Sequence, residues 1–234
     1  MSRTQSAYWQ GFRAGAPFIL VVIPFALLFG VVATEAGLKV IETMGMTVLV
    51  IAGTAQFAAI ALMRDEAPTY IVLATAMAVN LRMAMYSASI TPYLGQATLL
   101  QRIFVGYLLV DQSYAMSITK FETNPDLTMR QKLGFFFGTM TLIAPLWYVF
   151  TLVGALVGQA IPPQFALDFA VPITFIAITA PMMRTPAHLA AAFVSVTVSL
   201  LLAFLPYNLW LMIAAVLAMM TGAQVELWME RRAL

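Results

Sequence analysis

Apolar residues fill most of the chain in long runs, and short polar stretches separate one run from the next. A helix needs about 20 residues to cross the roughly 30 Å of hydrocarbon in a bilayer. The pattern therefore predicts eight membrane-spanning helices, at residues 17–34, 43–63, 68–90, 101–119, 132–158, 165–183, 186–205 and 207–227. Because the last two connections are tight, seven spans are the main alternative.

The composition agrees with a membrane protein. Hydrophobic residues make up 62% of the 234 residues and charged residues only 9%, whereas a soluble domain carries about 25% charged residues. We therefore predict an all-α, polytopic integral membrane bundle that forms a single domain over residues 1–234. The chain has no cysteine, which excludes disulfides and thiolate metal sites.

The positive charges predict an orientation, because cytoplasmic loops of membrane proteins collect Lys and Arg. With eight spans, the side that holds both termini receives Arg3, Arg13, Arg64, Lys120, Arg130, Lys132, Arg184, Arg231 and Arg232. The opposite side receives only Lys39 and Arg102. This bias predicts that both termini are cytoplasmic.

Two charges lie at equal depth well inside consecutive predicted spans, where they cannot reach water. Arg82 lies in the third span and Asp111 in the fourth. If these spans form an antiparallel hairpin, both residues lie equally far from its turn and hence at the same depth. A charged side chain at mid-depth costs at least about 2.5–3.5 kcal/mol on insertion scales. Two interpretations stay open: a structural ion pair, or a site on the path of a substrate or ion.

Polar residues near this level strengthen the second interpretation. The second span contains Thr54 and Gln56 in GTAQF, the third contains Asn80, and the fourth contains Gln112. Each of them alone is more typical of helix packing, and their nearness to two charges makes them candidate binding residues.

Prolines within the spans predict breaks, because each removes a backbone donor and frees a carbonyl. The best candidates for broken helices are VVIPFALLFG and VPITFIAITAP. Pro17 precedes Gly30 by the same thirteen residues that separate Pro145 from Gly158, which hints at a weak internal repeat.

Several motifs resemble the AzlC family, the large subunit of bacterial branched-chain amino acid exporters. They are PFALLFG in the first span, GTAQF in the second, NLRMAMYSASITPYL in the third and VDQSYA in the fourth. The resemblance implies a cell inner membrane protein that exports leucine, isoleucine and valine, and sometimes methionine. It also implies a partner, a small AzlD-like membrane subunit of about four helices.

The family's polar positions map onto Gln56, the triplet Asn80, Leu81 and Arg82, and Asp111. Two positions depart from the family pattern. Met83 stands where His is common, and Gln112 stands where Glu is frequent. Both departures remove a titratable group and put proton coupling at these positions in doubt.

These observations predict a secondary transporter for an amino acid. The sequence has no P-loop, and the segments outside the spans are too short for a nucleotide-binding domain. Arg82 is expected to bind the substrate's carboxylate and Asp111 its ammonium group, while Gln56, Asn80, Gln112 and Thr54 complete the polar end of the site. No cofactor and no nucleic acid are expected.

Three other functions remain as alternatives: an exporter or channel for another small hydrophobic or zwitterionic solute, a scaffold subunit that transports nothing, and a membrane enzyme. A single histidine and the lack of metal-spaced acids argue against an enzyme.

Overall fold

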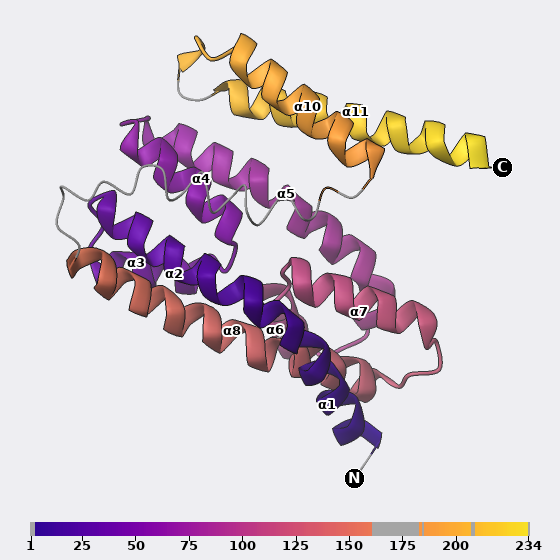
Figure 1. Cartoon of the computed structure of the whole chain (residues 1–234). Helices are drawn as coiled ribbons and strands as arrows, with labels where there is room; N and C mark the ends of the chain where they lie inside the picture. Colours follow the sequence, from indigo (N-terminus) through magenta and orange to yellow (C-terminus); the bar gives the residue numbers. More distant parts are fainter. Residues whose placement is uncertain (1–2, 161–182, 184, 207–208, 234) are drawn as a thin grey trace. The chain divides into compact units, whose positions relative to one another are not determined.

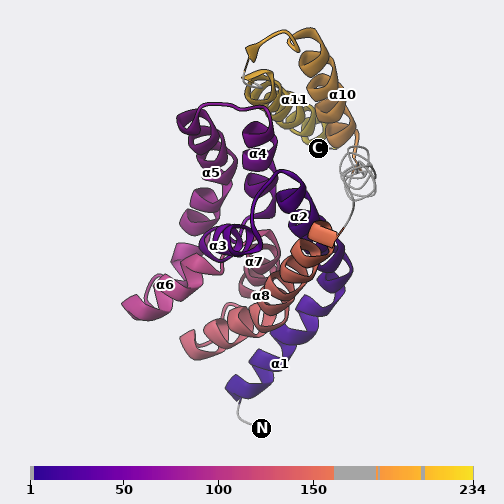
Figure 2. The same cartoon turned by 90° about the vertical axis from the view of Figure 1, so that its left-hand side faces the viewer.

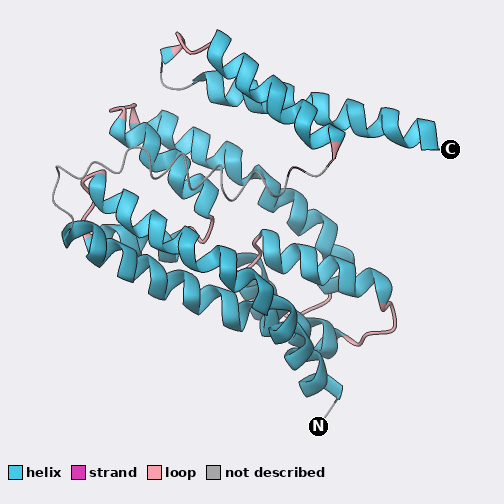
Figure 3. Ribbon diagram, in the orientation of Figure 1, coloured by secondary structure: helices cyan, strands magenta, loops and turns pink. Residues whose placement is uncertain are grey.

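The computed structural model describes residues 3–160, 183, 185–206 and 209–233 (Figure 1). Within these ranges all regular structure is helical and no strand occurs (Figure 3). The all-α prediction is therefore confirmed for the described part of the chain. The predicted span at 165–183 lies outside it except for Met183, and so does the proline-containing stretch at 171–181.

The chain divides into two compact units. The first contains residues 1–61 and 73–165, and the second contains residues 62–72 and 166–234. The single domain expected for residues 1–234 stays a prediction.

The helices up to residue 160 are α1 (Arg3–Gly15), the 3₁₀ turn η1 (Ala16–Phe18), α2 (Ile19–Glu35), α3 (Val40–Leu49), α4 (Gly53–Arg64), α5 (Thr69–Leu94), α6 (Leu99–Tyr107), α7 (Asp111–Thr123) and α8 (Met129–Ala160). They are followed by α10 (Pro186–Leu201) and α11 (Leu209–Ala233). In the described residues four stretches are long and apolar enough to cross a membrane: Ser6–Glu35, Thr69–Leu94, Met129–Ala160 and Leu209–Met229.

Large apolar side chains lie on the outside of these helices. Leu20, Leu49 and Leu200 expose 83%, 80% and 75% of their surface. A water-soluble protein does not present so many large apolar residues to solvent, whereas lipid chains solvate such a surface well.

The first span is one helical rod, formed by α1, η1 and α2 without a gap between residues 6 and 35. Pro24 lies inside α2, and the helix continues on both sides of it. The break predicted in VVIPFALLFG is therefore wrong. A proline removes one backbone hydrogen bond, and neighbouring turns can hold the helix together across that gap.

Helix α8 packs along this rod and runs in the same direction. Gly11 and Gly138 lie at one end of the contact, where each approaches the other helix's backbone at Phe135 and Tyr8. Gly30 and Gly154 do the same further along, against Thr151 and Leu27. Residue numbers rise together on both helices, so the pair is parallel. Glycine permits this close approach because it has no side chain.

Helices α5 and α7 also run parallel to each other. Arg82 meets Asp111, the ring of Tyr86 stacks on that of Tyr114, and the ring of Tyr93 lies 5.7 Å from that of Phe121. Two consecutive spans are expected to form an antiparallel pair, so the parallel arrangement differs from the prediction. The equal depth of Arg82 and Asp111 is confirmed, but the reason for it is different.

The reason is that the predicted span at 101–119 does not cross as one helix. It is divided at residues 108–110 into α6 and α7. Helix α6 starts on the side of the membrane where α5 ends and runs inward. Because α7 is parallel to α5, it runs outward again and ends on that same side. The two helices form a re-entrant hairpin, and the prediction of a straight span is wrong.

The predicted span at 43–63 is divided in the same way, at residues 50–52 between α3 and α4 (Figure 2). Helix α3 starts on the side where α2 ends. Helix α4 ends four residues before α5 begins, and α5 begins on that same side. The α3–α4 pair is therefore a second re-entrant hairpin, which enters from the side opposite to α6–α7.

These two hairpins change which loops share a side. Arg102, expected opposite the N-terminus, lies on the N-terminal side, and Arg64 ends α4 on the opposite side. The positive charges still favour the N-terminal side, which also holds Arg13, Lys120, Arg130 and Lys132. The cytoplasmic location of the termini stays a prediction.

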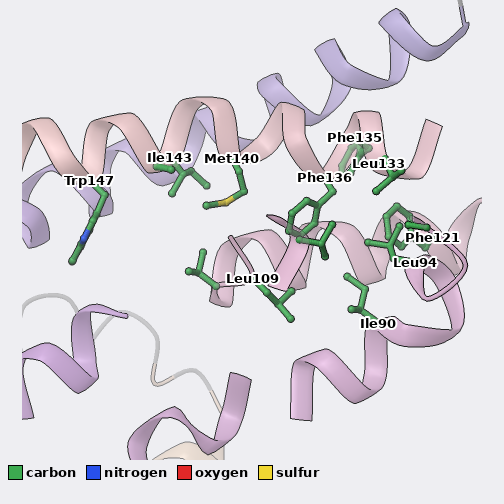
Figure 4. Close-up of a cluster of buried hydrophobic side chains, with 14 of the residues drawn as sticks. Ile90, Leu94, Leu109, Phe121, Leu133, Phe135, Phe136, Met140, Ile143 and Trp147 are labelled. Carbon is green, nitrogen blue, oxygen red and sulfur yellow. The ribbon is translucent and has the colours of Figure 1, made fainter. Parts of the chain in front are cut away.

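A cluster of buried apolar side chains joins the α6–α7 hairpin to α8. Figure 4 shows Met140 of α8 above Leu109, and Leu133 of α8 beside Phe121 of α7. The cluster holds the hairpin tip at a fixed depth beside α8.

In the second unit, α10 and α11 form an antiparallel helical hairpin. Gly222 of α11 lies against Ala191 and Ala187 near the start of α10. Thr185 caps α10 by accepting a hydrogen bond from the backbone N–H of His188 at 3.2 Å.

The hairpins predict a labelling pattern for single cysteines, which the cysteine-free chain makes easy to read. We expect Gln96→Cys and Asp126→Cys to react with an impermeant maleimide from the same side of the membrane, and Lys39→Cys from the other. Eight simple spans place Gln96 with Lys39 instead. Labelling of Gln96 and Lys39 from one side would exclude the α6–α7 hairpin.

Close packing of α8 on the first rod predicts a sharp response to one methyl group. A Cβ at Gly154 would collide with the backbone of Leu27, whereas a Cβ at Gly45 in α3 meets nothing within 4 Å. Gly154→Ala should lower stability by about 1–3 kcal/mol, and Gly45→Ala should not. Thermal unfolding of the detergent-solubilised protein measures both, and equal stability of the two variants contradicts the packing described.

Candidate functional site

Arg82 lies near the middle of α5, and its guanidinium reaches both re-entrant hairpins. Its Nη1 atom lies 3.2 Å from Oδ2 of Asp111, and its Nη2 atom donates a hydrogen bond to Oγ1 of Thr54. The pairing inferred from matched depth is therefore present. Arg82 and Asp111 expose 27% and 43% of their side chains, so the pair remains accessible.

Both partners of Arg82 stand at the beginning of a helix. Thr54 is the second residue of α4 and Asp111 is the first residue of α7. The first N–H groups of a helix have no intrahelical acceptor and carry a partial positive charge. A carboxylate is stabilised there, which explains why Asp111 is tolerated at this depth.

The polar network continues from Asp111 to two tyrosines. The Tyr86 hydroxyl donates a hydrogen bond to Oδ1 of Asp111 at 2.9 Å. The rings of Tyr86 and Tyr114 stack with centroids 4.2 Å apart and planes 9° from parallel. The Tyr114 hydroxyl lies 2.8 Å from Oγ of Ser89. Arg82, Tyr86 and Ser89 thus form one face of α5, against Asp111 and Tyr114 of α7.

The tips of the two hairpins are also joined directly. The Tyr107 hydroxyl, at the end of α6, donates to the carbonyl oxygen of Val48 at 2.6 Å. The break after α3 leaves this carbonyl without its helical donor. The Tyr148 hydroxyl of α8 lies 2.7 Å from that of Tyr107. Since Tyr107 has a single proton, which it gives to Val48, Tyr148 is the donor in the second bond.

A buried polar side chain braces each break. Gln56 of α4 is fully buried and donates from Nε2 to Oγ1 of Thr47 in α3 at 2.9 Å. Ser113 of α7 is also fully buried, and its hydroxyl lies 2.9 Å from the carbonyl oxygen of Leu108. In a membrane, the backbone groups that a helix break frees must find hydrogen-bond partners within the protein.

Aromatic side chains hold the α3–α4 tip in place. A Cβ at Gly53 would lie 2.7 Å from ring atoms of both Phe25 and Trp147, so a larger residue here would require a ring to shift. The ring of Phe25 also packs edge-on against that of Phe57, with centroids 5.0 Å apart. The tip therefore sits between α2 and α8.

The structure brings together three of the six predicted site residues: Arg82, Asp111 and Thr54. Gln112 follows Asp111 in the first turn of α7. Gln56 braces the α3–α4 break, as described above. Asn80 precedes Arg82 by two residues, which directs it away from the Arg82 face of α5. Its buried Oδ1 has no hydrogen-bond partner among the described residues.

The sequence-based prediction missed Tyr86, whose hydroxyl bonds Asp111, and Tyr114, whose ring supports that of Tyr86. A signal for both was present in their spacing. Tyr86 follows Arg82 by four residues and Tyr114 follows Asp111 by three, so each lies on the same helix face as the charge before it.

Comparisons with known proteins identify the family of the chain. The sequence matches the AzlC protein family over residues 17–161, which include every residue of the network described above. The chain belongs to the AzlC family and is a membrane protein.

A curated relative is inner membrane protein YgaZ of Escherichia coli (strain K12). It is 23% identical over 181 residues, which cover 73% of this chain and 71% of YgaZ. No solved structure matches this chain.

The bond between the two hairpin tips predicts a measurable contribution to stability. Tyr107→Phe leaves the Val48 carbonyl without its hydrogen-bond donor in a membrane-spanning region, and we expect a loss of about 1–3 kcal/mol. Tyr148→Phe is the matched control, because it removes only the outer hydroxyl and keeps the bond to Val48. Thermal unfolding that ranks Tyr148→Phe as equally destabilising would contradict this role of Tyr107.

Proposed function

We propose that the chain is the large subunit of a secondary-active exporter of branched-chain amino acids in the cell inner membrane. The observation that carries this proposal is the Arg82–Asp111 ion pair, placed where two re-entrant hairpins meet at mid-depth. Charged residues at such depth and non-helical backbone inside a membrane protein are both typical of substrate and ion paths.

The ion pair suits a zwitterionic substrate because its two charges can exchange partners with it. The substrate's carboxylate takes the place of Asp111 at Arg82, and its ammonium group takes the place of Arg82 at Asp111. Each charge then keeps an opposite charge beside it, which avoids the cost of an unpaired ion at this depth. The partial exposure of both side chains leaves room for this exchange.

Membership of the AzlC family supports the choice of cargo and partner. From the family we expect leucine, isoleucine and valine, and methionine as a further substrate. We also expect a small AzlD-like subunit of about four helices. The name of the relative YgaZ supports the inner membrane as the location, and the charge distribution supports cytoplasmic termini.

Transport without chemistry fits the side chains better than catalysis does. Among the described residues no group of three or more His, Cys, Asp or Glu side chains is suited to hold a metal ion. We therefore propose a transporter and not an enzyme. The flux through the protein separates the alternatives. A channel would conduct without saturation, and an exporter of another small solute would show saturable flux of that solute. A scaffold subunit would show no flux.

The proposal predicts that export depends on both charges. Arg82→Gln and Asp111→Asn should each reduce counterflow of labelled leucine in proteoliposomes at least tenfold, because a substrate charge then loses its counter-charge. The full chain should be assayed alone and together with any subunit that co-purifies with it. Arg102→Gln, an exposed arginine at the start of α6, is the control and should transport normally.

Normal counterflow in either site variant would remove the ion pair from the transport path. A variant that no longer elutes as a folded protein would show instead that the pair is needed for folding. Saturable flux of a different solute, with none of leucine, would keep the transporter and replace its cargo.

A further inference from the structure

Tyr86 shares the carboxylate of Asp111 with Arg82. The Tyr86 hydroxyl bonds Oδ1 at 2.9 Å, while Arg82 lies 3.2 Å from Oδ2. The two residues are one helical turn apart on α5, so a single helix face holds both oxygens of one side chain. Asp111 keeps a partner on Oδ1 even when Oδ2 is released.

The phenol ring that carries this hydroxyl is held firmly. It stacks on Tyr114 at 4.2 Å, and the Tyr114 hydroxyl is tied to Ser89 at 2.8 Å. An offset or stacked aromatic pair restricts both rings to one orientation. The Tyr86 hydroxyl is therefore aimed at Asp111 by packing from α7 and not only by its own bond.

We propose that Tyr86 is the positioning residue that prepares Asp111 to receive the substrate's ammonium group. The inference rests on the proposed function. When the substrate's carboxylate binds Arg82, Oδ2 of Asp111 loses its partner. The bond from Tyr86 keeps the carboxylate at the start of α7, with Oδ2 directed to the place that Arg82 occupied. The Asp111 side chain is 43% exposed, so an arriving cation can reach it.

The consequence is selectivity for the amino group. A site that holds a carboxylate ready for an ammonium group disfavours an analogue that lacks one, because the charge of Asp111 is then left without a counter-charge. Tyr86 would thus distinguish an amino acid from the corresponding 2-oxo acid, while Arg82 binds the carboxylate that both compounds share.

Two variants, each of which lacks one tyrosine hydroxyl of the wild type, test the role of Tyr86. Tyr86→Phe keeps the ring stack and loses the bond to Asp111. Tyr114→Phe keeps the ring stack and loses only the bond to Ser89. The probes are leucine, leucinol, which lacks the carboxylate, and 4-methyl-2-oxopentanoate, which lacks the ammonium group. Binding to the purified full chain, with any co-purifying subunit, is measured by direct titration.

We expect Tyr86→Phe to weaken the binding of leucine and of leucinol roughly tenfold. This factor corresponds to one hydrogen bond to a charged group. Affinity for 4-methyl-2-oxopentanoate should stay unchanged, so the preference for leucine over the oxo acid falls by the same factor. Tyr114→Phe should leave all three affinities near those of the wild type. Purely structural loss cannot produce this probe-dependent pattern.

Equal weakening of all three probes by Tyr86→Phe, or equal effects of the two variants, would overturn the positioning role and leave the exporter proposal intact. A wild-type chain that binds neither leucine nor leucinol would instead overturn the proposed function, and the role of Tyr86 with it.

Discussion

A guanidinium group at the middle of an apolar helix needs acceptors that lipid does not supply, and the first unit is organised around this need. Arg82 obtains a carboxylate from α7 and a hydroxyl from α4. Both acceptors come from helix beginnings, which can exist at this depth only because two helices are interrupted there. The charge and the broken helices therefore depend on one another.

Interrupting a helix inside a membrane exposes backbone groups, and each exposed group costs several kcal/mol unless the protein satisfies it. The chain meets this requirement with a small number of buried side chains. Tyr107 serves the carbonyl of Val48, Ser113 lies against that of Leu108, and Gln56 ties α4 back to α3. The two hairpins pack against a tightly packed pair of helices. The rod α1–α2 and the parallel helix α8 approach each other backbone to backbone at their glycines. The polar centre around Arg82 is thus supported by tightly packed helices.

Much of this could be read from the sequence, because hydropathy and charge report directly on the solvent of each segment. Helical class, the long span over α5, the long helix α8 and the level match of Arg82 with Asp111 follow from such patterns. The breaks did not, since the proline at 24 drew the prediction to a place where the helix continues. Pro24 is accommodated within α2, while the breaks at 50–52 and 108–110 contain no proline. Their signal was of another kind. Gly53–Thr54 and Asp111 are residues that favour the beginning of a helix, here found in the middle of apolar runs. Because Asp111 was interpreted only as a charge inside a span, the start of a helix at this residue was not predicted.

Helix direction at the tips also sets the electrostatic character of the centre. Each N-terminus contributes about half a positive charge, and both α4 and α7 begin beside Arg82. Together with the guanidinium these ends exceed the single negative charge of Asp111, so the centre retains an attraction for an anion while the ion pair is closed. A carboxylate that arrives there can compete with Asp111 without first breaking the pair, and Asp111 then becomes the natural acceptor for a cation that arrives with it. In the proposed function, this excess of positive potential beside the carboxylate of Asp111 is the physical basis on which a zwitterion would bind here better than a simple anion or cation.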